Sequence, residues 1–141
     1  MNRKLRERGS ATIEALMVVP VIAVFFALTV LGGRLAITHQ AVQAAAADAA
    51  RSASIARTAS AASFGGQAAG YAGLANQGLT CSPAAVRVDT SQFNRPVGTP
   101  ATITATISCH VPTSDLSLPG VPGTMLVEAS QTSPLDTYRE R

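Results

Sequence analysis

Residue types that commonly carry out catalysis are sparse in this chain of 141 residues. Its two cysteines are Cys81 and Cys109, and its two histidines are His39 and His110. Cys109 and His110 are neighbours in a predicted strand, so their side chains point to opposite faces and cannot form a nucleophile–base pair. His39 has no cysteine or acid cluster nearby in the sequence that would complete a metal site. Phosphate-binding loops and paired carboxylates are also missing, so the sequence predicts a protein that is not an enzyme and needs no metal or cofactor.

The most informative charged residue is Glu14, which directly precedes an uncharged apolar run over residues 15–33. This run would rise about 28 Å as a helix, which is close to the thickness of the hydrocarbon layer of a bilayer. Pro20 lies inside the run, and membrane helices tolerate such a proline although it usually bends them. Gly32 and Gly33 at the end of the run indicate either fraying or a hinge. A carboxylate taken to the centre of a membrane helix costs about 2.5–3.5 kcal/mol, so Glu14 either lies among the lipid headgroups or has a partner.

The formal net charge of +3 originates at the N-terminus. Residues 1–9 hold four basic residues and one acidic residue, whereas the two signs balance over residues 10–141. A nucleic-acid partner requires a basic face on the folded part, and the sequence offers none. Basic residues ahead of an apolar run instead keep the N-terminus in the cytoplasm. The pattern predicts a single-pass membrane protein whose C-terminal part lies outside the cytoplasm.

Residues 8–14 read Arg-Gly-Ser-Ala-Thr-Ile-Glu and lead directly into the apolar run. A basic leader, a glycine, a small residue and a glutamate five positions after the glycine resemble a type IV prepilin signal. The resemblance implies that a prepilin peptidase of the membrane cuts between Gly9 and Ser10. Glu14 would then be the fifth residue of the mature chain, where the acid of this family pairs with the N-terminal amine of a neighbouring subunit. Each charge makes the other tolerable in an apolar bundle.

The wider stretch over residues 8–57 resembles the TadE-like family, the minor pseudopilins of the tight-adherence pilus, a type IVc-like system. The shared features include the proline within the apolar run, Gly33-Arg34 near its end, and an Ala-rich segment with the element Asp48-Ala-Ala-Arg51. The resemblance implies a structural protein of the bacterial cytoplasmic membrane, or of a pilus on the cell surface. Its implied partners are the peptidase, other pilins or pseudopilins, inner-membrane components of pilus assembly and membrane lipid.

An Ala-rich helix is predicted to follow the apolar run. Residues 35–62 contain no proline or glycine and are dominated by alanine, the strongest helix former. If the membrane helix continues, residues 10–62 form one rod of about 80 Å. Asp48 and Arg51 lie three positions apart and either pair or remain solvated. The predicted organisation is therefore a leader over residues 1–9, a transmembrane and Ala-rich helix over 10–62, and a small extracytoplasmic domain over 63–141.

The distal domain is predicted to contain a small antiparallel sheet. Residues 101–109 alternate strictly between apolar residues and Thr or Ser, which predicts a half-buried strand. Residues 85–89 and 125–129 are weaker strand candidates, and residues 112–123 form a turn-rich loop between the last two strands. The Gly-rich residues 63–78 favour a short helix with loops. The predicted fold class is α+β, a long helix followed by three strands whose apolar face packs on the Ala-rich helix.

The two cysteines predict a disulfide. With a cytoplasmic N-terminus, Cys81 and Cys109 lie outside the membrane, where disulfides persist. A bond between them would stabilise the domain by about 3–4 kcal/mol in the chain-entropy model. Free thiols and an intermolecular bond are the alternatives.

Two other interpretations of the whole chain remain open. In the first, about 45 N-terminal residues are an ordinary signal peptide of a secreted protein, with the alanines of residues 44–46 as a cleavage site. In the second, the chain is a single-pass binding module of the cell envelope with an uncleaved anchor.

Overall fold

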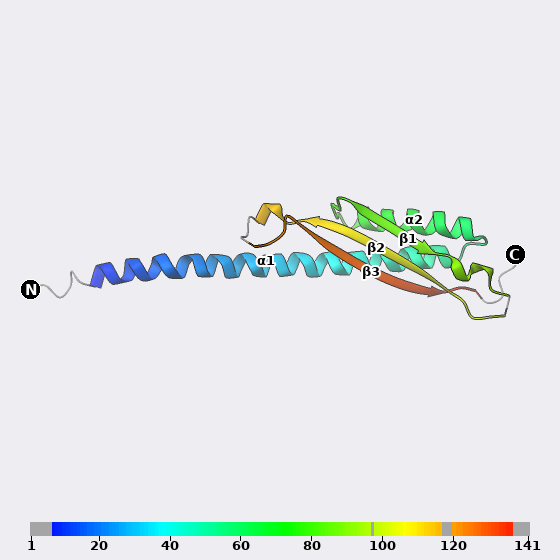
Figure 1. Ribbon diagram of the computed structural model, residues 1–141, viewed down its shortest axis with the longest axis horizontal. Coiled ribbons are helices and arrows are strands. Elements are labelled where there is room, and N and C mark those ends of the chain that lie inside the picture. Colours follow the sequence, from blue (N-terminus) through cyan, green and yellow to red (C-terminus); the bar gives the residue numbers. More distant parts are fainter. Residues whose placement is uncertain (1–6, 97, 117–119, 137–141) are drawn as a thin grey trace, which may run out of the picture.

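Two helices pack on one face of a three-stranded antiparallel sheet, and the first helix extends far beyond it (Figure 1). The computed structural model describes residues 7–96, 98–116 and 120–136, with the backbone alone for residues 7–12 and 116. The elements in chain order are α1 (Glu7–Ser54), α2 (Ala59–Asn76), β1 (Ala84–Asp89), η1 (Ser91–Asn94), β2 (Thr102–Pro112), η2 (Ser114–Leu116) and β3 (Thr124–Pro134). The predicted α+β class is confirmed, and α2 adds a second helix to it.

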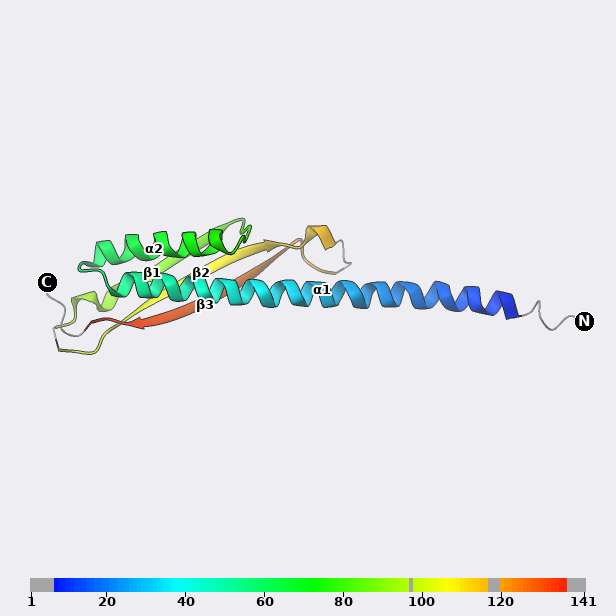
Figure 2. The same cartoon turned by 180° about the vertical axis from the view of Figure 1, so that it is seen from behind.

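α1 is a single helix of 48 residues, about 72 Å long, and it continues through Pro20. Its C-terminal half lies along the sheet, whereas its N-terminal half projects alone (Figures 1 and 2). The core therefore begins inside this helix, because Val42 and Ala46 are fully buried. The folded unit combines the second half of α1 with the chain that follows it.

The prediction of one helix over residues 10–62 is wrong beyond Ser54. The Ser54 hydroxyl donates to the Arg51 carbonyl at 2.9 Å, and the Thr58 hydroxyl accepts from the Ala61 N–H at 3.1 Å, which caps α2. Hydroxyl side chains at both ends of the turn bind backbone groups that the helices leave unpaired. The chain therefore reverses without a glycine or proline, and α2 runs back along α1.

α2 is an unbroken helix of 18 residues in the Gly-rich stretch, longer than the short helix with loops that the sequence favoured. Three of its four glycines, Gly66, Gly70 and Gly73, lie where other elements approach closely. A Cβ at Gly70 would lie 2.8 Å from Val86 Cγ1, and a Cβ at Gly73 would lie 3.0 Å from the Cβ of Ala45. Glycine inside a helix costs about 1 kcal/mol relative to alanine, and close packing against α1 and β1 offsets that cost.

The sheet follows the order β1-β2-β3, and both pairs are antiparallel. The predicted alternation of β2 is confirmed, because Ile103, Ala105 and Ile107 are fully buried while Thr104 and Thr106 between them are partly exposed. The two weaker strand candidates are also confirmed, and β2 and β3 each extend to 11 residues. The apolar face packs on the Ala-rich part of α1, as predicted, in a cluster that includes Val42, Ala45, Ala46, Ile107, Val127 and Ala129.

Candidate assembly surfaces

The N-terminal half of α1 presents large apolar side chains to solvent on every side. The exposed residues are Ile13, Leu16, Met17, Val18, Val19, Val21, Ile22, Val24, Phe25, Phe26, Leu28 and Val30. Only 6% of the most apolar window in this helix is buried, and no other helix of the described residues is long and apolar enough to cross a membrane. An apolar surface of this extent requires lipid or protein around it.

Glu14 is the acidic residue on this apolar surface, and it is exposed between Ile13 and Ala15. Within the described residues, no ion pair is formed by Glu14. Gly9 and Ser10 lie in the first turns of α1, where only the backbone is described, and residues 1–6 of the leader lie outside the described part. The predicted roles of these three residues stay predictions.

An ion pair marks the junction between the free and the packed halves of α1. Arg34 Nη1 lies 2.5 Å from Asp115 Oδ2 in η2. Both side chains are about half exposed, at 52% and 55%, so the pair contributes about 0–1 kcal/mol. Just before it, α1 continues through Gly32 and Gly33, where an added Cβ would meet nothing within 4 Å. Packing therefore does not require glycine at these two positions.

The same ion pair lines a cleft of about 530 Å³ beside α1 and the end of β2. Thr38, Leu79 and Val111 contribute further parts of its wall. Among the residues with described positions, no group of three or more His, Cys, Asp or Glu side chains could hold a metal ion. The wall of the cleft is mainly apolar, and it carries the ion pair of Arg34 and Asp115.

The outer face of the sheet is polar. Arg87, Asp89, Thr106 and Glu128 line a shallow hollow of about 300 Å³ on it. The Ser91 backbone N–H, followed by the Ser91 hydroxyl, lowers the pKa of Asp89. These charges are solvated, so this face suits water better than a packed partner.

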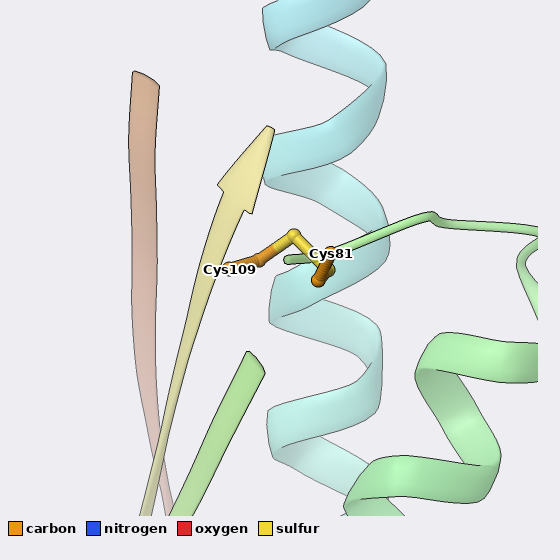
Figure 3. Close-up of a disulfide and its surroundings, with 2 residues drawn as sticks. All are labelled: Cys81 and Cys109. Carbon is orange, nitrogen blue, oxygen red and sulfur yellow. A yellow bond between two sulfur atoms is a disulfide. The ribbon is translucent and has the colours of Figure 1, made fainter. Parts of the chain in front are cut away.

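Cys81 and Cys109 lie at disulfide distance (Figure 3), with their Cα atoms 5.0 Å apart. Cys109 faces the core from β2, in the cluster that contains Val42 and Ala46, whereas Cys81 precedes β1. The predicted bond would therefore attach the segment after α2 to the core. His110 lies on the opposite face of β2 from Cys109, and His39 is exposed on α1.

Replacing both cysteines by alanine is expected to lower the free energy of unfolding by about 3–4 kcal/mol, because the unfolded chain loses the closed loop. Urea titration of the full chain in detergent, with and without reductant, measures the difference. Reductant should destabilise the wild-type chain and leave the double variant unchanged. Complete alkylation of both thiols without reduction would contradict the bond.

Sequence reasoning missed two contacts that shape these surfaces. Arg34 and Asp115 are 81 residues apart, and a surface ion pair leaves no periodic pattern in the sequence. The close contacts of Gly66, Gly70 and Gly73 were not predicted, because glycine in a sequence usually indicates that a helix is interrupted. Their spacing at three and four residues was the available signal, since these intervals place residues on one face of a helix.

The comparisons with known proteins bear on α1 in particular. The model of the TadE-like protein family matches residues 9–51. No curated protein and no solved structure matches the chain. The matched segment begins at the predicted cleavage position and ends near the last turn of α1, so it contains Glu14, the whole uncovered half of the helix and the first core residues. Over residues 9–51 the predicted resemblance is confirmed: this segment is TadE-like, and the family is associated with the tight-adherence pilus.

Proposed function

We propose that this chain is a minor pseudopilin of a tight-adherence pilus, anchored in the cytoplasmic membrane by the N-terminal half of α1 and processed after Gly9. One observation carries the proposal: the family match over residues 9–51 includes the whole of the helix half that the fold leaves uncovered. That half can be covered by lipid before assembly and by other subunits afterwards. The proposed role is structural: the chain acts through the surfaces that contact lipid and other subunits.

Processing would create a positively charged partner for the Glu14 carboxylate. Cleavage between Gly9 and Ser10 leaves an amine on Ser10, four residues before Glu14. These residues share one face of a helix and are separated by a rise of about 6 Å. Two subunits displaced by about that rise would bring the carboxylate of one to the amine of the next. In an apolar bundle each charge would then have its partner.

The secretory alternative conflicts with the position of the core. Cleavage near residue 46 would remove Val42, Ala45 and Ala46, which are at most 1% exposed and belong to the largest core cluster. The sheet would lose the α1 residues on which Ile107 and Ala129 pack. The core therefore favours a mature chain that keeps all of α1 after the leader. The envelope module with an uncleaved anchor remains the second candidate, and the N-terminal residue distinguishes it.

Glu14→Ala is expected to reduce the number of surface pili by about tenfold or more, because breaking a buried ion pair costs about 3–5 kcal/mol. Electron microscopy and immunoblots of sheared pili measure the effect in a complemented deletion strain. Glu128→Ala is the matched control, since Glu128 is exposed on the folded domain. Equal amounts of both variants in carbonate-washed membranes exclude a loss of the protein itself. Normal piliation by Glu14→Ala would contradict the proposed role of this residue.

A further inference from the structure

We infer that the cleft beside α1 binds the headgroup of a phospholipid that carries both a phosphate and a primary ammonium group, as phosphatidylethanolamine does. The cleft holds about 530 Å³, within the range of about 300–1,000 Å³ that is typical of small-molecule sites. Its wall carries the guanidinium and the carboxylate of the Arg34–Asp115 pair. This inference rests on the proposed membrane anchor, because the anchor places the cleft at the level of the lipid headgroups.

The cleft lies at the end of the folded domain nearest the projecting half of α1. The short orange helix η2, which contributes Asp115 to the wall, stands at this end (Figures 1 and 2). From α1 the wall takes Arg34, Ile37 and Thr38, which lie one, four and five residues after the end of the apolar run. Along a helix these positions lie about 1.5, 6 and 7.5 Å beyond that end. If the apolar run fills the hydrocarbon layer, the cleft lies at the height of the headgroup layer, which is about 5–7 Å thick on each side.

The folded domain also reaches the end of the apolar run itself. Leu31 lies inside the run and is 8% exposed, whereas Phe25, further toward the N-terminus, is 70% exposed. Leu31, Arg34 and Thr38 are spaced by three and four residues, so they share one face of α1. The face that the domain covers therefore begins within the run and continues past the level of the headgroups. A lipid that stands beside the helix at this level lies next to the cleft.

The charges of the wall fit a zwitterionic headgroup. A phosphate would bind Arg34, whose planar guanidinium suits phosphate oxygens, and an ammonium would bind the Asp115 carboxylate. Both side chains are about half exposed, so they can exchange part of their mutual contact for contacts with the headgroup. An anionic headgroup such as that of phosphatidylglycerol has no cation for Asp115 and would place its phosphate beside this carboxylate. A headgroup with one charge of each sign therefore fits best.

The wall also distinguishes a primary ammonium from the quaternary ammonium of choline. A primary ammonium donates up to three hydrogen bonds, which the Asp115 carboxylate can accept. Proteins typically bind quaternary ammonium groups with aromatic rings. None of the described residues that line the cleft is aromatic. The lining therefore favours ethanolamine over choline.

Thr38 supplies a polar group inside the cleft. Its side chain is buried, at 5% exposure, and its hydroxyl forms no hydrogen bond within the described part of the chain. A hydroxyl on so buried a side chain normally has a partner, and an oxygen of the headgroup would accept its hydrogen bond. Leu79 and Val111 provide apolar wall for the carbon atoms next to the phosphate. The cleft thus combines polar groups with an apolar surface, as an amphipathic ligand requires.

Native mass spectrometry of the full chain in detergent, with short-chain phospholipids as probes, tests the inference. Dihexanoyl phosphatidylethanolamine should bind about tenfold more tightly than the choline and glycerol lipids with the same chains, because only its ammonium donates hydrogen bonds to a carboxylate. In the Asp115→Asn variant the preference for ethanolamine over choline should disappear. Equal affinities of the wild-type chain for the three lipids, or an unchanged preference in Asp115→Asn, would overturn the inference.

Two further variants complete the test. Glu128→Gln is the matched control and should keep the wild-type preference, because it neutralises a carboxylate on the outer face of the sheet, outside the cleft. Loss of the ion pair in Asp115→Asn should leave the chain folded, since a half-exposed pair contributes little to stability. Thr38→Val keeps the shape of the wall and should weaken binding of the ethanolamine lipid about two- to tenfold, the effect of one lost hydrogen bond. Unchanged affinity in Thr38→Val would contradict the placement of the headgroup in this cleft.

Failure of the anchor and failure of the site give different results. Carbonate extraction of cell membranes tests anchoring by itself, whereas soluble short-chain lipids need no anchor to reach the cleft. A chain that is extracted by carbonate and still prefers the ethanolamine lipid would refute the proposed anchor and support the site. A chain that stays in the membrane and binds the three lipids equally would refute the site alone.

Discussion

Gly70→Leu is expected to destabilise the folded domain by about 3 kcal/mol or more, the high end of the cost of overpacking a core. Even a Cβ at this position would lie 2.8 Å from Val86 Cγ1 and 3.2 Å from Ile107 Cδ1. Ile107 is fully buried, and Val86 is 6% exposed, so neither side chain can move into free space. The larger side chain must therefore separate α2 from the sheet. Urea titration of the full chain in detergent, followed by circular dichroism, measures the loss.

Two alanine variants provide the matched control for this prediction. Gly70→Ala should also destabilise, because its methyl group occupies the position of the close contact. Gly65→Ala should be neutral or should stabilise by up to about 1 kcal/mol, because its Cβ would lie 3.6 Å from Ser52 Oγ and alanine favours the helix. If Gly70→Leu unfolds at the same urea concentration as the wild-type chain, the account of α2 packing is wrong.

Gly9→Arg is expected to abolish processing and, with it, pilus formation. The residue before the cut must enter a narrow protease site, and arginine replaces a hydrogen atom with a long charged side chain. The variant should accumulate in the membrane with residues 1–9 still attached, which intact-mass measurement detects. Leu5→Arg adds the same side chain to the leader away from the cleavage position, and it should still be processed. Gly9→Arg protein with the mass of the processed wild type would contradict the prediction.

The strands were predictable because each depends on a local pattern, and the proximity of Cys81 and Cys109 was predictable because the chain has two cysteines. In β2 the alternation of Ile103, Ala105 and Ile107 with threonine survives in the fold, because one face of the sheet packs on helices and the other meets solvent. The sheet then brings Cys81 close to Cys109, since Ala84 pairs with Cys109 at the start of β1. The apolar run was equally predictable, because the described part of the chain leaves most of its side chains exposed.

The turn after Ser54 and the continuity of α2 were not predictable from helix propensity. Alanine favours a helix over residues 35–62 without indicating where the helix ends, and the end depends on hydroxyl contacts at Ser54 and Thr58. The glycines of α2 are unfavourable for a helix in isolation. Only the three-dimensional contacts with Ala45, Val86 and Ile107 show that a larger side chain would not fit. Hydroxyl contacts therefore decided the turn after Ser54, and packing decided the continuity of α2.

The N-terminal residue of the chain isolated from cell membranes tests the central claim most directly. Edman sequencing or intact-mass measurement should place the start at Ser10, which leaves the new amine four residues before Glu14. A start at Met1 would contradict processing by a prepilin peptidase. A start near Ala47 would contradict the anchor itself, because both the apolar half of α1 and its first core residues would then be missing.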